Sequence, residues 1–254
     1  MGLLKGKKAL ILGVANDKSI AWGIAKAFSD EGAELAFTFA GEVLEKRVRP
    51  LAESVNAKLV MQCDVTKDEE VSAVMKEIEK TWGKFDIVVH SVAYAKKDDL
   101  KGGFISTTRD GFALAMDISA YSLVHVTREA FPYLNDGATV LTLSYLGAER
   151  AVPNYNMMGV AKAALEACVR YLAVDLGPHN MRINAISAGP IRTLAASGIG
   201  GFWDLIAHVE KFAPMKRSVT IEEVGRNAVY LCSELSSGTT GEVIHVDGGH
   251  HAVI

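Results

Sequence analysis

The chain has 254 residues, of which 49% are hydrophobic and 22% charged, a composition typical of folded proteins and unlike that of disordered chains. Lys and Arg number 27 against 30 Asp and Glu, so the net charge of −3 gives no electrostatic support for nucleic-acid binding. The longest stretch without a charged residue, 137–148, is shorter than the roughly 18–20 residues that a membrane-spanning helix needs. We therefore expect no nucleic-acid partner and no membrane span.

Cysteine usage and the N-terminal residues indicate a reducing compartment. Cys63, Cys168 and Cys232 are spread along the chain without the paired spacing of a metal or redox motif. Three early lysines precede a short apolar stretch, 9–15, which is at the lower limit for a secretion signal and lacks a convincing cleavage site. We expect a cytoplasmic protein with no bound metal, whose cysteines are small buried side chains.

Short apolar runs alternate along the chain with longer segments of helical periodicity, which is typical of repeated βαβ units. The predicted strands are 9–12, 34–39, 58–62, 85–90, 138–143, 182–187 and 243–246. The predicted helices are 19–30, 43–55, 69–81, a long helix ending near residue 131, 155–176 and 221–232. Because the strands are apolar throughout, we expect an α/β fold, a single Rossmann-like doubly wound parallel sheet of seven strands. No linker or repeat divides the chain, so 1–254 should form one dinucleotide-binding and catalytic domain.

A turn covering residues 13–23 follows directly on the first predicted strand and leads into a helix that Ser19 could cap. Backbone N–H groups in such a turn and the positive end of the helix dipole would face an anion, which suits a dinucleotide pyrophosphate. The turn departs from the G-x-G-x-x-G pattern, and Gly13 and Gly23 could simply allow a turn and close helix packing. Its place in the first βα unit favours the phosphate-binding interpretation.

The residues after the second strand indicate which dinucleotide is bound. Residues 38–42 contain no Arg or Lys that could hold a 2′-phosphate. Lys46 and Arg47 follow, but their place inside the next helix favours a solvated face. We therefore predict NADH in preference to NADPH. Asp64, just past the third strand, could accept a hydrogen bond from the adenine amino group or cap the segment that follows it.

Tyr155 and Lys162 lie on the helix that follows the fifth strand. Their spacing of about two helical turns places them on one face, roughly 10 Å apart along the axis. A nearby ammonium favours the phenolate and should lower the tyrosine pKa. Such a phenol can donate a proton or a hydrogen bond to developing negative charge. A buried ring and a surface charge would be the alternative interpretation for an isolated Tyr and Lys.

The segment 190–214 fits the βα rhythm least. Glycines interrupt an apolar stretch there, at the carboxyl end of a predicted strand. We expect a mobile lid, and an ordinary surface helix with a loose start is the alternative.

Several motifs together resemble the short-chain dehydrogenase/reductase superfamily over essentially the whole chain. These are the glycine-rich first turn, Asp64-Val65, His90-Ser91, the Tyr–Lys pair, the stretch 183–190 and Val246-Asp247-Gly248-Gly249. Most of that superfamily has three residues between the tyrosine and the lysine, whereas six intervene here. The wide spacing, with the stretches 144–150 and 190–195, resembles the divergent branch that holds the bacterial enoyl-acyl-carrier-protein reductases.

This resemblance implies roles for individual residues. Tyr155 would hydrogen-bond the substrate thioester oxygen, Tyr145 would be the second active-site tyrosine, and Lys162 would hold the nicotinamide ribose. The implied cofactor contacts are Gly13, Ser19, Ile20, Asp64, Val65, Val92, Lys162, Ile191, Arg192, Thr193, Leu194 and Ala195. The expected substrate-binding residues are Ala95, Tyr145, Tyr155, Met158 and Phe202. The segment 190–214 falls where the family has its substrate-covering flap.

The resemblance implies an NADH-dependent reductase of the trans-2-enoyl group on acyl carrier protein in fatty-acid biosynthesis, assembled as a homotetramer. The wide Tyr–Lys spacing suits this reaction, because charge collects on a thioester oxygen two bonds from the carbon that accepts the hydride. A 3-oxoacyl or other carbonyl reductase is one alternative, and a non-catalytic dinucleotide-binding sensor or scaffold is another. An acidic carrier protein calls for a basic patch, for which Lys211, Lys216 and Arg217 are candidates.

Overall fold

The computed structural model describes residues 2–194 and 200–253, and these residues form one sheet of seven parallel strands. The strand order is β3-β2-β1-β4-β5-β6-β7. The strands are β1 (Lys8–Leu12), β2 (Glu34–Phe39), β3 (Leu59–Gln62), β4 (Phe85–His90), β5 (Leu134–Ser144), β6 (Arg182–Ala188) and β7 (Val243–Val246). The order reverses between β1 and β4, and ligands of doubly wound sheets bind beside the carboxyl ends of strands at such a reversal. The predicted fold class is confirmed.

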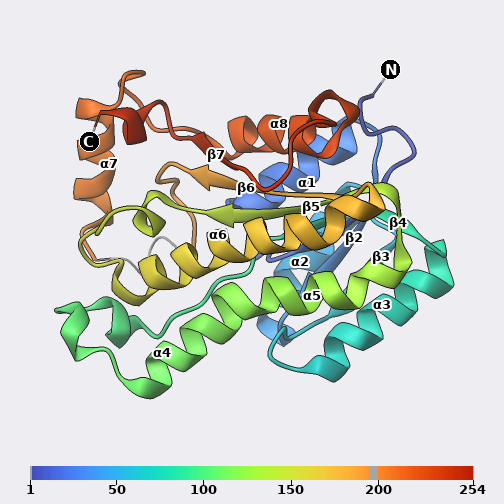
Figure 1. Cartoon of the computed structure of the whole chain (residues 1–254), viewed down its shortest axis with the longest axis horizontal. Helices are drawn as coiled ribbons and strands as arrows, with labels where there is room; N and C mark the ends of the chain where they lie inside the picture. Colours follow the sequence, from blue (N-terminus) through green and yellow to red (C-terminus); the bar gives the residue numbers. More distant parts are fainter. Residues whose placement is uncertain (1, 195–199, 254) are drawn as a thin grey trace.

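Helices cover both faces of the sheet, so each strand feeds two cores (Figure 1). The helices are α1 (Ile20–Asp30), α2 (Glu42–Ser54), α3 (Asp68–Trp82), α4 (Arg109–Met116), α5 (Ser122–Ala130), α6 (Asn156–Leu176), α7 (Phe202–Phe212) and α8 (Ile221–Cys232). In β1, Ala9 and Ile11 join the core beneath α1, α2 and α8, whereas Leu10 and Leu12 join the core beneath α3, α5 and α6. This alternation is the period of two expected of a strand.

Four predicted elements differ from the structure. The long helix before the fifth strand is divided into α4 and α5 by a π-helical turn, Asp117–Tyr121. β5 begins at Leu134, four residues before the predicted start. The edge strands β3 and β7 are largely half-buried, because each has a neighbour on one side only, so the prediction of complete burial is wrong for them. The segment predicted as a flap contains α7, whereas residues 195–199 of it lie outside the described residues.

Two glycines let α1 and α8 approach closely. A Cβ atom on Gly23 would lie 2.5 Å from the carbonyl oxygen of Ile221, and one on Gly225 would lie 2.5 Å from the carbonyl oxygen of Gly23. Both separations are shorter than any normal contact, so only glycine allows the two backbones to meet here. This contact supports the close-packing interpretation of Gly23 and fixes α1 near its N-terminal end.

Neither a membrane helix nor a metal cluster is found in the part of the chain that the structure describes. None of its helices has the length and apolarity to cross a bilayer. Its His, Cys, Asp and Glu side chains form no group of three or more that could hold a metal ion.

Candidate active site

The two predicted active-site tyrosines are in direct contact. Tyr145 follows the last residue of β5, and Tyr155 immediately precedes α6. Their ring centroids are 4.8 Å apart at an interplanar angle of 65°, an edge-to-face contact of the kind aromatic rings prefer. The end of β5 and the start of α6 therefore each place a phenol at the carboxyl edge of the sheet.

Apolar side chains surround this tyrosine pair. The cluster contains Leu100, Met158, Ala95 and Val152 besides the two rings. Four of the five predicted substrate-binding residues, Ala95, Tyr145, Tyr155 and Met158, are thus brought together. The fifth, Phe202, is buried in a separate cluster on α7. Leu100 was missed, because the short helical turn that carries it has no periodic pattern in the sequence.

Tyr155 is one residue outside the helix predicted to contain it. The regular helix begins at Asn156, whose φ of +40° is rare for a non-glycine residue. Tyr155 itself has helical angles and accepts a hydrogen bond from the N–H of Met158, so it is the capping residue. The predicted helix boundary is therefore wrong by one position, and the backbone at Asn156 departs from the continuous helix on which the two-turn spacing was based.

Burial, and not the lysine, controls the ionisation of the tyrosines. It raises the pKa of Tyr145 to about 12 and that of Tyr155 above its usual range, where the charges of Tyr145 and Glu166 raise it further. The prediction that Lys162 lowers the tyrosine pKa is wrong, because the cost of removing a phenolate from water dominates. Burial also lowers the pKa of Lys162 to about 8. At neutral pH both phenols are protonated hydrogen-bond donors.

Lys162 is held by the end of β5. Its Nζ atom donates a hydrogen bond to the carbonyl oxygen of Leu143 over 2.6 Å, and the side chain is buried. The next residue, Ser144, donates its hydroxyl to the carboxylate of Glu166, one turn beyond Lys162 on α6. Neither Ser144 nor Glu166 was predicted as part of the site, although their positions at the strand end and beyond the lysine were a usable signal.

His90 belongs to the core beside the site. Its Nδ1 lies 3.2 Å from Thr142 Oγ1 and its Nε2 lies 2.8 Å from Ser122 Oγ, so the ring joins β4 to β5 and α5. Burial, with a smaller contribution from Lys162, lowers the pKa of His90 to about 3. The imidazole is therefore neutral at physiological pH and has a structural role.

The loop after β1 has the geometry of an anion site. Gly13 has a φ of +98°, and a Cβ atom there would lie 2.0 Å from the carbonyl oxygen of Ser91. Ser19 occupies the capping position of α1, but its hydroxyl accepts hydrogen bonds from the N–H groups of Ala15 and Asn16, each over 3.0 Å, and makes none to the first helical turn. The prediction that its side chain caps the helix is wrong, because the hydroxyl closes the loop instead.

The first turn of α1 keeps free donors. Within the described residues, the backbone N–H groups of Ile20 and Ala21 have no acceptor. Such donors at the positive end of a helix fit a pyrophosphate, so this loop suits the predicted dinucleotide.

At the adenosine end, Asp64 accepts hydrogen bonds from the N–H and hydroxyl groups of Thr66 through its Oδ1 atom, at 3.0 and 2.8 Å. Asp64 Oδ1 therefore caps the segment that follows, as in the alternative interpretation, whereas Oδ2 could still accept a hydrogen bond from a ligand. Val65 is buried and Val92 packs against the core beneath α3, so both are placed by the sheet. Beyond β2, Ala40 is exposed and the first turn of α2 carries Glu42 and Glu45.

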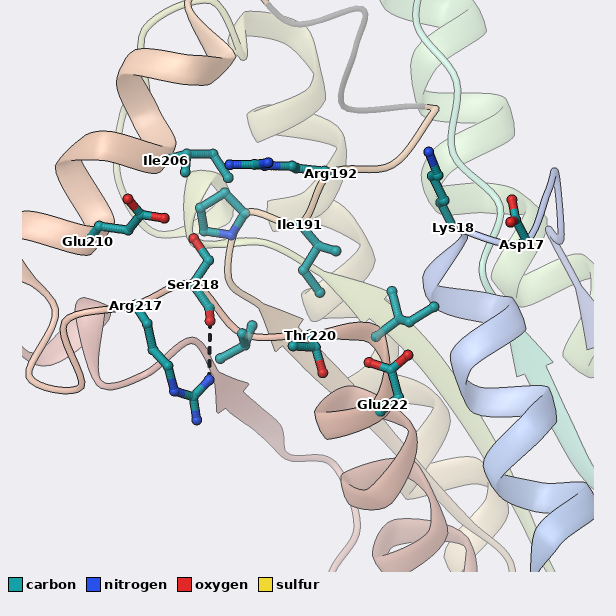
Figure 2. A pocket seen from close by; sticks show the side chains of 13 residues that line it. Asp17, Lys18, Ile191, Arg192, Ile206, Glu210, Arg217, Ser218, Thr220 and Glu222 are labelled. Carbon is teal, nitrogen blue, oxygen red and sulfur yellow. Dashed lines mark hydrogen bonds between the residues drawn. The ribbon is translucent and has the colours of Figure 1, made fainter.

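The loop after β6 borders a cavity of about 520 Å³. Figure 2 shows Arg192 extending from this loop toward Ile206 of α7, and Lys18 in the turn just before α1, with the start of α8 as a further wall. Ile191 also lines the cavity, and the Arg192 guanidinium lies 4.5 Å above the Trp203 ring. The cavity adjoins the loop after β1 through Asp17 and Lys18, and neither Tyr145 nor Tyr155 lines it.

The other predicted cofactor contacts after β6 are Thr193, Leu194 and Ala195. The N–H of Thr193 donates to the carbonyl oxygen of Ile191 over 2.8 Å, and Leu194 is half exposed. Ala195 lies outside the described residues. A second cavity, of about 370 Å³, lies beside Tyr155 between α6 and residues 147–152.

The residues of the candidate basic patch, Lys211, Lys216 and Arg217, already make contacts within the chain. Lys216 Nζ donates to the carbonyl oxygen of Lys211 over 2.9 Å, so these two residues adjoin. Arg217 makes two hydrogen bonds to the Glu223 carboxylate, at 2.9 and 2.7 Å. Its charge is therefore compensated and adds little to an anion-binding surface.

Comparison with known proteins agrees with this geometry. The model of the enoyl-(acyl carrier protein) reductase family matches residues 13–251. The chain is 57% identical to enoyl-acyl-carrier-protein reductase (NADH) 1 of Rhizobium meliloti over 99% of this chain and 93% of that protein. The corresponding enzyme of Aquifex aeolicus is 56% identical over the same shares.

Solved structures give the same result. The crystal structure of the Bacillus cereus enoyl-acyl carrier protein reductase with NADP⁺ and indole naphthyridinone is 54% identical and superimposes with a TM-score of 0.98 over 100% of both chains. A family match over nearly the whole chain, together with relatives above 50% identity, confirms the predicted resemblance. The chain belongs to the enoyl-acyl-carrier-protein reductase family.

Proposed function

We propose that this chain reduces the trans-2-enoyl group on acyl carrier protein, with Tyr145, Tyr155 and Lys162 as its catalytic residues. The observation that carries the proposal is the contact between two buried phenols at the sheet edge, beside a lysine anchored to β5. The predictions of an oxidoreductase and of NADH are confirmed by relatives of 52–57% identity whose names state that activity. When bound, NADH supplies the hydride that the β-carbon of the substrate accepts.

Tyr155 donates a hydrogen bond from its neutral phenol to the thioester oxygen. Negative charge develops on that oxygen as the β-carbon accepts hydride, so a fixed donor lowers the barrier. Burial keeps the proton on the phenol at neutral pH and excludes water, which strengthens the bond in the transition state. Tyr145 packs against the ring edge and holds Tyr155 in place.

Lys162 and the loops at the carboxyl edge bind the dinucleotide. The Lys162 ammonium has donors left after its bond to Leu143, and these would hold the nicotinamide ribose. The free N–H groups of Ile20 and Ala21 would hold the pyrophosphate. Residues 190–214 would close over the acyl chain, and Ala95, Met158 and Phe202 would line its pocket.

Acidic residues beyond β2 support NADH in preference to NADPH. A 2′-phosphate at this place would face Glu42 and Glu45 in the first turn of α2, whereas Lys46 and Arg47 are exposed on its outer side. The ratio of kcat/KM for NADH and NADPH tests this preference. A higher value for NADPH would overturn it.

A single domain, residues 1–254, would carry both the cofactor and the substrate site. We expect the enzyme in the cytoplasm, with acyl carrier protein as its partner. We also expect a homotetramer, for which the exposed Tyr171 and Val174 on α6 are candidate contacts.

The deciding experiment follows NADH consumption with three mixtures. A trans-2-enoyl thioester should be reduced rapidly. A 3-oxoacyl thioester should react at least about a hundredfold more slowly, since its reduction needs the phenol beside the carbon that accepts hydride. Faster turnover of the 3-oxoacyl substrate would favour a carbonyl reductase. NADH binding without turnover of either thioester would favour a sensor or scaffold.

A further inference from the structure

Two consecutive residues at the end of β5 form hydrogen bonds with two side chains that lie one turn apart on α6. The carbonyl oxygen of Leu143 accepts a hydrogen bond from Lys162 Nζ, and the hydroxyl of Ser144 donates to the Glu166 carboxylate. Ser144, Lys162 and Glu166 are 5%, 7% and 8% exposed. The next residue is Tyr145, so these bonds fasten the segment that carries one catalytic tyrosine to the helix that begins after the other.

Glu166 is also the acidic group that acts on Lys162. Side chains four positions apart lie on the same face of a helix, and a buried ammonium is costly unless a negative charge lies near it. Burial lowers the pKa of Lys162, and the charge of Glu166 raises it in opposition. From β4, His90 lies near the ammonium, but its own pKa of about 3 leaves it uncharged.

The groups that act on Glu166 come from β5, the residues after it, β7 and α6 itself. Burial raises the pKa of the Glu166 carboxyl above its usual range, and the hydrogen bond from Ser144 of β5 opposes this by lowering it. The charge of Glu149, which follows β5, raises it, whereas His245 on β7 and Arg170 on α6 lower it. The hydrogen bond from Ser144 is made to the anionic form, so it favours the charge opposite Lys162.

We propose that Glu166 is a positioning residue: its carboxylate, oriented by Ser144, provides the negative charge opposite the Lys162 ammonium and fixes the end of β5 that carries Tyr145. The proposal rests on the proposed role of Lys162 as the ligand of the cofactor ribose. In this proposal Glu166 affects cofactor affinity only through Lys162. It contacts neither the substrate nor the cofactor.

The test measures the dissociation constant of NADH as a function of pH, by fluorescence titration of the whole enzyme without substrate. In the wild type, affinity should fall as pH rises through about 8, where Lys162 loses its proton. Glu166→Gln keeps an acceptor for Ser144 but removes the charge, so the fall should begin about one pH unit lower. Affinity at pH 7.5 should then be about threefold weaker than in the wild type, and nearly equal at pH 6.

Asp175→Asn is the matched control, because it removes one carboxylate from an exposed position on the same helix. Its pH midpoint should equal that of the wild type. An unchanged midpoint in Glu166→Gln would overturn the proposal, as would an equal shift in the control. If the Gln variant does not fold by circular dichroism, Glu166→Asp serves instead, and its retained charge should leave the midpoint within about 0.3 units of the wild type.

Ser144→Ala provides an independent readout. It keeps the carboxylate but removes the hydrogen bond that favours its anionic form, so the NADH midpoint should shift less than in Glu166→Gln. Its kcat with an enoyl thioester should fall about tenfold, because Tyr145 loses its anchored neighbour. An unchanged kcat would overturn the anchoring role. Failure of the proposed function is seen separately, as a wild type that binds NADH without reducing the thioester, and the binding titration still tests Glu166 in that case.

Discussion

The environment of Tyr155 penalises the phenolate, which fits the donor role proposed for this residue. Full burial raises its pKa, and the neighbouring Tyr145 and Glu166 act in the same direction. A protonated phenol fits a reaction in which negative charge develops on a substrate oxygen, since the hydrogen bond strengthens as that charge grows. The proton is thus available throughout the neutral pH range.

Tyr155→Phe removes this donor and keeps the ring packing against Tyr145. We expect kcat to fall about a hundredfold or more, with the KM for NADH nearly unchanged, because the lost bond is made mainly in the transition state. Lys162→Met should instead weaken NADH binding. Steady-state kinetics with an enoyl thioester separate the two effects. Full turnover by the Phe variant would show that the tyrosine has been assigned wrongly.

His90 should make the stability of the fold depend on pH. Its pKa is lowered from 6.5 to about 3 by burial, so between these values the unfolded chain binds a proton that the folded chain does not. Stability is therefore fully present above pH 6.5 and falls as pH decreases toward 3. At pH 5 this loss amounts to about 2 kcal/mol.

The variant His90→Gln can still bond Thr142 and Ser122 but cannot take up the proton. Between pH 7.5 and pH 5 it should lose about 2 kcal/mol less stability than the wild type. Urea unfolding at both pH values measures the difference. Equal losses in the two proteins would rule out His90 as the titrating group.

At the scale of elements, the approach of α8 to α1 controls where the loop after β1, the proposed pyrophosphate site, lies. Gly23 and Gly225 remove the side chains that would hold the two helices apart. α8 itself starts with a capping box, in which Thr220 and Glu223 satisfy each other's backbone N–H groups. The N-terminal turn of α1, with the free N–H groups of Ile20 and Ala21, is thereby fixed from behind.

Gly225→Ala tests this contact. The added Cβ atom would lie 2.5 Å from the carbonyl oxygen of Gly23 and 3.0 Å from Ala27, so the helices must separate. We expect a loss of about 1–3 kcal/mol in the free energy of unfolding and weaker NADH binding. Gly177→Ala is the control, because no atom lies within 4 Å of a Cβ there. Equal melting temperatures for the two variants would contradict the argument.

Some elements could be predicted from the sequence and others could not, for physical reasons. The apolar runs of β1 and β4 and the periodicity of α8 mark these elements within about a residue. The π-helical turn between α4 and α5 was missed because its residues, 117–121, continue the helical pattern. The predicted direction of the Tyr155 pKa shift is wrong because burial dominates it. Burial depends on the packing around the ring, and the sequence spacing between Tyr155 and Lys162 carries no information about that packing.

For the whole molecule, the reversal of strand order between β1 and β4 gathers the site from distant parts of the chain. The proposed pyrophosphate site follows β1, Ala95 lies beyond β4, and Tyr145 follows β5. The far end of α6 and the short helical turn after α8, Glu234–Ser236, carry exposed apolar side chains. Tyr171 and Val174 are 77% and 72% exposed, and Leu235 is 63% exposed.

We propose that these side chains form a contact in the proposed homotetramer. Tyr171 and Val174 are three positions apart on α6 and so lie on one helix face, which a neighbouring subunit would cover. Light scattering should give four subunit masses for the wild type, and fewer for Tyr171→Glu combined with Val174→Lys. Val43→Lys, on the similarly exposed start of α2, should leave the mass unchanged. One subunit mass for the wild type would refute the homotetramer, whereas four for the double variant would move the contact away from α6.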